Sequence, residues 1–206
     1  MFNDISNVFY INLEDRKDRK INVEKQLNNI GFNYTRFNAI KTNSGRVGCS
    51  LSHLKVLQIA KQQKLPYVII VEDDIYFTNI NIFKKQLKDF LNSGINYDVY
   101  LLAGNIRTPP TEVSNGIFKI NSCFTTTGYI VKEHYYDVLI NNIKEGINKL
   151  LKNPKNGYNA IDVYWINLQK KDKWYISKPR TVTQLPDYSD IEKRNVNYNH
   201  CMLDKI

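Results

Sequence analysis

Three consecutive carboxylates, Glu72, Asp73 and Asp74, directly follow a run of apolar β-formers from Val68 to Val71. Such a run predicts a strand buried on both faces, as in the middle of a parallel sheet. Ligands of open α/β sheets bind beyond the carboxyl ends of the strands, where these acids fall. Because close carboxylates repel one another, one interpretation is an Mg²⁺ or Mn²⁺ ion that also holds a phosphorylated substrate. The other interpretation is an acidic turn after a strand.

Basic and small residues occur earlier in the chain. Arg16 and Arg19 follow the first predicted strand, where a guanidinium group can form a fork with a diphosphate, or else is a solvated charge at a helix start. Gly48 to His53 falls at a predicted junction of loop and helix, where free amides favour an anion. Ser52 and His53 would add hydrogen bonds to a phosphate, or His53 would orient a carboxylate; a purely local hydrogen-bonding role is the alternative.

Two later segments are also candidates. The Thr127-Gly128-Tyr129 step places a glycine inside a strand, which indicates a close approach to the backbone by a sugar ring near Tyr129, or a β-bulge. Asp162 stands among aromatic and aliphatic residues. Partial burial would raise the pKa of Asp162 and make it a better base, whereas the alternative is an acid favoured by a helix N-terminus.

The elements that must position these residues alternate along the chain. Apolar periodicity predicts strands at 8–13, 32–37, 67–71, 97–103 and 174–177, with paired strands within 117–131. Helices are predicted at 17–30, from a cap at Ser50 or Ser52, around 83–91, at 133–151 and at 160–168, with a loop at 41–48. This order predicts an α/β fold with a mostly parallel sheet flanked by helices, in a single domain over 1–206. The polar segment 186–206 is expected to form a flap or a mobile tail.

Composition restricts the class of protein. The net charge of +9 over 206 residues fits a nucleic-acid binder or a protein with a phosphate-bearing substrate. Acids interleave with the basic residues and no nucleic-acid motif occurs, which argues against nucleic acid. Cys49, Cys123 and Cys201 include no CxxC pair, which argues against a zinc site or a disulfide framework and favours a reducing compartment. No apolar run reaches transmembrane length, and Met1 to Asp4 lack the basic start of a signal peptide.

These motifs, in this order, resemble glycosyltransferase family 25, which includes lipooligosaccharide and collagen galactosyltransferases. The resemblance rests first on the string from Ile11 to Arg19, on Gly48-Cys49 with Ser52-His53, and on Glu72-Asp73-Asp74. Thr127-Gly128-Tyr129, Ile161-Asp162 and Ser189-Asp190-Ile191 are similar to later blocks of the family. The resemblance therefore extends over nearly the whole chain.

The resemblance implies a GT-A fold and an inverting transfer from a nucleotide-diphosphate sugar, usually UDP-galactose or UDP-glucose. The three acids occupy the place of a DxD-type motif, although Glu72 stands first. It implies Mn²⁺ or Mg²⁺ at Asp74 and Glu72, with Glu72 or Asp73 turned towards the nucleotide. The donor would lie along Asn12, Leu13, Arg16 and Arg19.

The acceptor hydroxyl of a glycan or glycoprotein needs a carboxylate base, for which Asp162 is the first choice and Asp190 the second. Two other classes remain open: a nucleotide-sugar-binding protein that has lost catalysis, and a metal-dependent phosphohydrolase or nuclease. We expect a cytoplasmic enzyme, with peripheral membrane contact left open. The many asparagines, isoleucines and lysines suggest an AT-rich bacterial or large-DNA-virus genome.

Overall fold

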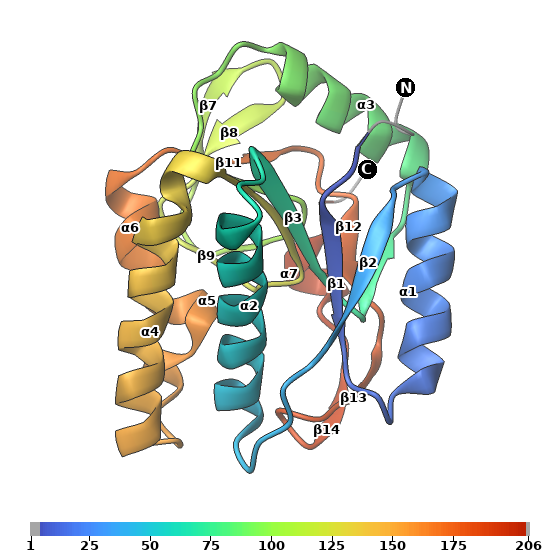
Figure 1. The fold of residues 1–206 in the computed structure, drawn as a ribbon. Helices are drawn as coiled ribbons and strands as arrows, with labels where there is room; N and C mark the ends of the chain where they lie inside the picture. The colour runs from blue at the N-terminus through green and yellow to red at the C-terminus, as the bar shows by residue number, and fades with distance from the viewer. Residues whose placement is uncertain (1–4, 205–206) are drawn as a thin grey trace.

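The fold is an α/β sandwich in which one large sheet lies between helices (Figure 1). The computed structural model describes residues 5–204. The sheet has eight strands in the order β2-β1-β3-β10-β5-β11-β8-β7. Their bounds are β1 Val8–Asn12, β2 Tyr34–Asn38, β3 Tyr67–Glu72, β5 Val99–Leu101, β7 Thr111–Ser114, β8 Ile117–Lys119, β10 Gly128–Lys132 and β11 Trp174–Ser177. Strands β1, β2, β3, β5 and β11 run in one direction, whereas β10 and β8 are reversed. The predicted α/β fold with a mostly parallel sheet is confirmed.

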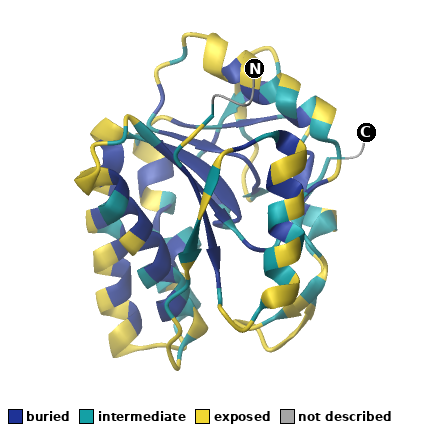
Figure 2. Cartoon of the chain, turned by 45° about the vertical axis from the view of Figure 1, so that its right-hand side comes forward, coloured by how far each residue is buried: buried dark blue, intermediate teal, exposed yellow. Residues whose placement is uncertain are grey.

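Helices cover both faces of the sheet, and their inner sides are buried while their outer sides are exposed (Figure 2). Helices α2, α4, α5 and α6 contribute to the hydrophobic cluster on one face, and α1 and α3 to the cluster on the other. Their bounds are α1 Lys17–Ile30, α2 Gly45–Gln62, α3 Ile80–Asn92, α4 Tyr136–Lys152, α5 Ile161–Tyr164 and α6 Ile166–Lys171, with short 3-10 turns η2 Glu133–Tyr135 and η3 Gly157–Asn159.

Strand β3 shows why the acids end where they do. Val68 and Ile70 belong to the core beneath α2 and α4, whereas Ile69 and Val71 belong to the core beneath α1. Successive side chains of a strand point to opposite faces, so a strand with a helical layer on each side must be apolar throughout. The chain becomes polar only where β3 leaves the sheet, at Glu72.

Three two-stranded ribbons complete the fold: β4 Ile75–Phe77 with β12 Val182–Gln184, β6 Asn105–Ile106 with β9 Cys123–Phe124, and β13 Asp187–Ser189 with β14 Arg194–Val196. The segment expected to be a flap or tail thus forms the β13–β14 hairpin and the short helix α7 Asn199–Met202 over residues 187–202. Arg180 anchors the chain around and after α7, because it donates to the carboxylate of Asp204 at 2.8 Å and to the carbonyl oxygen of Cys201 at 2.7 Å.

The start of α2 differs from the prediction. The helix begins at Gly45, so the predicted loop is shorter, and neither Ser50 nor Ser52 is its cap. Their hydroxyls donate instead to carbonyl oxygens four residues back within the helix. Gly48 lies in the first turn, where a Cβ atom would be 2.5 Å from the carbonyl oxygen of Ile40. The glycine is therefore needed because the incoming chain passes close to the helix.

The strands within 117–131 do not pair with each other. Strand β8 pairs with β11 and β7, and β10 pairs with β3 and β5. An apolar pattern predicts a strand but carries no information on its partner. Met1 to Asp4, from which the sequence predicted the lack of a signal peptide, lie outside the described residues. Across the described part of the chain, every helix is too short or too polar to cross a membrane.

Candidate functional site

Glu72 is the last residue of β3, and Asp73 and Asp74 form the turn that leads into β4. Their side chains are 18%, 11% and 16% exposed, respectively. They are therefore partly accessible to solvent, neither on the open surface nor fully in the core.

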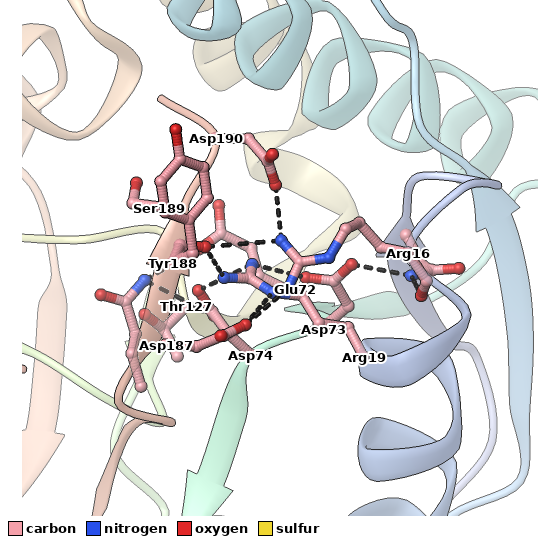
Figure 3. A network of polar contacts seen from close by, with 12 residues as sticks. Arg16, Arg19, Glu72, Asp73, Asp74, Thr127, Asp187, Tyr188, Ser189 and Asp190 are labelled. Atoms are coloured by element: carbon pink, nitrogen blue, oxygen red, sulfur yellow. Dashed lines mark hydrogen bonds and ion pairs between the residues drawn. The ribbon is translucent and has the colours of Figure 1, made fainter. Parts of the chain in front are cut away.

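Arg19, in the first turn of α1, lies against this cluster. Its guanidinium group is 3.1 Å from Asp73 and 3.4 Å from Asp74, and its Nε donates to Asp187 at 3.1 Å. Its other terminal nitrogen donates to the carbonyl oxygen of Tyr188 at 2.9 Å. One arginine thus connects the end of β3 with the β13–β14 hairpin (Figure 3).

Arg16 lies beside Arg19 and contacts the same hairpin (Figure 3). It pairs with Asp187, with Asp190 at 2.7 Å and with Asp18 at 2.9 Å. Charge-assisted hydrogen bonds of this kind are the strong ones in a partly buried setting. The hairpin is consequently held over the acid cluster by two cations that come from the start of α1.

The cluster carries more negative charge than these contacts balance. Burial, followed by the charges of Glu72 and Asp73, raises the pKa of Asp74 well above its ordinary value. Burial also raises the pKa of Asp73, although the positive charge of Arg19 opposes it. Within residues 5–204, lysine makes no ion pair with any of these acids. An all-oxygen site with surplus negative charge has the chemistry that Mg²⁺ and Mn²⁺ prefer.

The opposite side of Glu72 is held by hydrogen-bonding side chains. Its Oε1 accepts hydrogen bonds from the hydroxyl of Thr126 at 2.8 Å and from Cys49 Sγ at 3.6 Å, and lies 3.3 Å from His53 Nε2. Burial works to raise the pKa of Glu72, but the hydrogen bond and charge of His53 and the bond from Thr126 leave it lowered. Gln184 Nε2 reaches both Glu72 Oε2, at 3.4 Å, and an oxygen of Asp74, at 3.5 Å.

Asp162 lies in the first turn of helix α5, and its carboxylate accepts a hydrogen bond from the backbone N–H of Thr125 at 3.1 Å. Burial raises the pKa of Asp162, the bond from Thr125 lowers it, and the negative charge of Glu72 raises it further. Asp162 therefore belongs to the Glu72 side of the site. A raised pKa brings a carboxylate closer to the range in which a general base works efficiently.

The structure brings together most of the residues singled out in the sequence. Asn12 and Arg19 meet the acids, and Arg16 contacts the β13–β14 hairpin beside them. Leu13 contributes the carbonyl oxygen that closes the turn before α1, at 3.0 Å from the amide of Arg16. Asn12 is 1% exposed and donates to Asp73 at 2.7 Å. It thus holds that carboxylate and does not face a ligand.

The Thr127-Gly128-Tyr129 step and Ser52 need correction. All four residues are buried, so they do not touch a donor sugar in this arrangement. The close approach at Gly128 comes from Ile75, whose Cδ1 would be 2.9 Å from an added Cβ. Tyr129 is completely buried and its hydroxyl lies 2.8 Å from His53 Nδ1. The hydroxyl of Ser52 donates to the carbonyl oxygen of Gly48 and accepts from the backbone N–H of Ile40. His53 is equally buried, so of its two predicted roles the geometry favours orienting a carboxylate over binding phosphate.

Sequence reasoning missed three residues of the site: Thr126, Gln184 and Asp187. Thr126 adjoins the Thr127-Gly128-Tyr129 step, which the sequence did indicate, but its contact with Glu72 joins residues 54 positions apart. Gln184 and Asp187 lie more than 100 residues from the acids and the arginines that they contact. The only available signal was the polar run after Pro186, which contains two aspartates close together.

The geometry agrees with a comparison of the sequence with protein families. The family model described as glycosyltransferase family 25 (LPS biosynthesis protein) matches residues 43–153, which is more than half of the chain. The chain belongs to glycosyltransferase family 25. The matched part of this family 25 enzyme includes Cys49, His53, the three acids and Thr126, whereas Arg16, Arg19 and Asp162 lie outside it.

Solved structures show the same fold. One is a glycosyltransferase involved in the glycosylation of the major capsid of PBCV-1, with 12% identity and a TM-score of 0.53 over 85% of this chain and 82% of that one. Another is mannose-1-phosphate geranyltransferase from Thermus thermophilus, with 10% identity and a TM-score of 0.50 over 84% and 73%. Among curated proteins, a search finds no significant match. The family 25 chain therefore has the expected GT-A-type fold and is a glycosyltransferase.

Proposed function

We propose that this family 25 enzyme is a metal-dependent, inverting hexosyltransferase. Its donor would be a nucleotide-diphosphate sugar, with UDP-galactose or UDP-glucose as first choice, and its acceptor a hydroxyl group of a glycan or of a glycosylated protein. The observation that carries the proposal is the surplus negative charge at Glu72, Asp73 and Asp74, at the carboxyl end of a central strand and beside two arginines.

The residues fit a hard divalent cation. Glu72 Oε2 and Asp74 both reach the amide of Gln184, so two carboxylates point to one place and can supply oxygen ligands there. When bound, Mn²⁺ or Mg²⁺ supplies Lewis-acid stabilisation of the charge that develops on the departing nucleotide diphosphate. Asp73, held by Asn12 and Arg19, is turned towards the residues at the end of β1 and the start of α1.

Arg16 and Arg19 have the chemistry to bind the diphosphate. A guanidinium fork matches phosphate oxygens. Both arginines now pair with aspartates of the hairpin, and Arg19 also pairs with the aspartates that follow β3. Exchange of aspartate for phosphate would bring the donor under the β13–β14 hairpin. The hairpin would then act as a flap over the bound nucleotide.

Asp162 is our first choice for the base that takes the proton from the acceptor hydroxyl. It is a partly buried carboxylate with a raised pKa on the Glu72 side of the site. Asp190 is the second choice, but it is half-exposed and paired with Arg16. Its carboxylate is already engaged by the guanidinium group of Arg16, so the geometry favours Asp162.

Binding of nucleotide sugars measured by calorimetry, with and without Mn²⁺, tests the proposal. We expect UDP-galactose or UDP-glucose to bind. Mn²⁺ should tighten this binding and should permit either sugar transfer or a slow hydrolysis of the donor. Asp74→Ala should lose the Mn²⁺ effect, whereas Asp89→Ala, at an exposed ion pair on α3, should keep it. A protein that binds the donor without any turnover would be the inactive binding protein instead.

The single domain that we propose would carry both donor and acceptor sites. We also propose a reducing compartment such as the cytoplasm as the place of action, because all three cysteines are unpaired. Fractionation of cells that express the tagged protein would check that location.

A further inference from the structure

The inner oxygen of Glu72 faces a small polar group of side chains behind the site. Thr126, His53 and Cys49 all direct a polar atom at Oε1, at 2.8, 3.3 and 3.6 Å. The outer oxygen, Oε2, instead has the side-chain amide of Gln184 as its neighbour. The two oxygens of one carboxylate thus have separate surroundings.

The three groups are held in place by the fold. Cys49 and His53 are one turn apart on the same face of α2, which packs on the sheet beside β3. Thr126 precedes β10, the strand that pairs with β3. His53 is completely buried and Thr126 nearly so, which means that neither side chain has room to change its direction.

Tyr129 fixes the ring of His53 from the other side. Its hydroxyl lies 2.8 Å from His53 Nδ1, and the two rings stack at 5.6 Å with an angle of 21°. Tyr129 is itself buried, edge-on to Trp165 at 5.4 Å. If Tyr129 donates to Nδ1, then the proton of the neutral imidazole is on Nε2, and Nε2 donates to Glu72. Each polar atom in the row Tyr129, His53, Glu72 then has a partner.

We infer that Cys49, His53 and Thr126 are positioning residues, which act together on Glu72. Their hydrogen bonds hold Oε1 and thereby aim Oε2 at the place that Asp74 also faces, while Tyr129 keeps the His53 ring in its donating orientation. The inference rests on the proposed function, in which that place receives the metal and the diphosphate. Hydrogen-bond partners behind a ligating carboxylate commonly set its direction and its affinity for metal.

A different role for the same atoms would be a second metal site. Cys49 Sγ, His53 Nε2 and a Glu72 oxygen all lie within 4.8 Å of one another, and thiolate with imidazole is a ligand set for zinc. We favour hydrogen bonding because thiol, imidazole N–H and hydroxyl are all donors here and share one acceptor. A metal would replace the first two donors by ligands and would leave Thr126 as the only donor to that oxygen.

Matched variants test the inference. Thr126→Val removes the hydroxyl with little change of shape, and Thr126→Ser keeps a hydroxyl. Cys49→Ala and Cys49→Ser form a second pair, in which only the serine variant keeps a donor. For each variant we would measure the dissociation constant of Mn²⁺ in the presence of UDP, kcat and KM for the donor, and the thermal midpoint.

We expect Thr126→Val to weaken Mn²⁺ binding and to lower kcat by about 10- to 100-fold, as is usual for residues behind a metal ligand. Thr126→Ser should restore most of both, and Cys49→Ala should show a smaller loss that Cys49→Ser repairs. Folded variants that lose thermal stability but keep Mn²⁺ affinity and kcat would overturn the inference, because their role would be structural.

Metal analysis of the purified enzyme distinguishes hydrogen-bond positioning of Glu72 from the zinc-site alternative. Tightly bound zinc at one equivalent, lost in Cys49→Ser, would overturn hydrogen-bond positioning in favour of a ligand role. Absence of UDP binding by the wild-type enzyme, in contrast, would refute the proposed function itself. The two failures are therefore distinguishable in the same set of measurements.

Discussion

Glu72 and Asp74 are two residues apart in the chain, yet their surroundings are opposite. Glu72 is held from the core by hydrogen bonds, and the hydrogen bond and charge of His53, together with the bond from Thr126, lower its pKa despite burial. Asp74 faces Arg19, and burial and neighbouring negative charge raise its pKa well above normal. One side of the site is therefore held by hydrogen bonds from the core, whereas the other side carries a carboxylate whose ionised form is disfavoured and would be stabilised by an added cation.

The strongest test of this difference is Asp74→Asn. We expect transfer to fall by at least about 1000-fold, because stabilisation of the leaving group by a metal is worth several kcal/mol. The thermal midpoint of the metal-free enzyme should nevertheless rise at neutral pH, because the variant removes an unbalanced buried charge. Activity assays and thermal unfolding of the same sample check both effects. A loss of both activity and stability would mean that Asp74 is structural.

Asp162→Asn should spare donor binding and lower kcat on the order of 100-fold or more, which is the usual contribution of a general base. The amide keeps an acceptor for the N–H of Thr125, so the fold should persist. Donor affinity by calorimetry and turnover by product analysis give the two readouts. Unchanged turnover would exclude Asp162 as the base.

Arg19→Met should weaken UDP binding by about 10- to 100-fold, because a guanidinium–phosphate fork contributes more than a neutral hydrogen bond. The variant also leaves Asp73 and Asp187 without their shared cation. Lys20→Met changes a neighbouring exposed charge on the same helix and is the matched control. Equal effects of the two substitutions would point to general electrostatics and not to the fork.

Stability of the metal-free enzyme should depend on pH in a defined direction. Asp74 has a raised pKa in the folded state, so its contribution is present at low pH and is lost as the pH rises through that value. Glu72 has a lowered pKa, so its contribution is lost only at pH values below the ordinary carboxylate range. As the pH rises from the ordinary carboxylate range towards the raised pKa of Asp74, the thermal midpoint should therefore fall by a few degrees, and Mn²⁺ should restore it. A thermal midpoint that depends on neither pH nor Mn²⁺ would contradict the difference between Glu72 and Asp74.

Asp190→Asn should have the smallest effect. Its ion pair with Arg16 is 45% exposed on the carboxylate side, and such pairs contribute about 1 kcal/mol or less. We expect turnover to change by less than about fivefold. A loss on the order of 100-fold would instead identify Asp190 as the base and would remove Asp162 from that role.

The local parts of this enzyme were predictable from sequence. Helix α1 has the predicted bounds, because Gly31 in a left-handed conformation ends it, and β3 follows its apolar run. The start of α2 was not predictable. Ser50 and Ser52 were predicted as caps, but their hydroxyls donate to carbonyl oxygens four residues earlier in the helix. Local sequence patterns therefore indicate the secondary structure that each segment favours.

The composition of the site was predictable only in part. The acids and arginines were identifiable because charged residues that directly follow a buried strand indicate a site. The contacts that hold Glu72, and the approach of Gln184 and Asp187, depend on which strands become neighbours. Sheet order is a property of the whole chain, and no local pattern near Thr126 or Gln184 encodes it.

The link between Arg16 and Asp187 also has a consequence for folding. These partners are 171 positions apart, so the link closes a loop that spans most of the polypeptide. Contacts of such long sequence separation form late, because the entropy of closing the loop must be offset first. During synthesis the sheet can assemble before residue 187 leaves the ribosome. A nascent chain would therefore be folded for some time before it gains affinity for its sugar nucleotide.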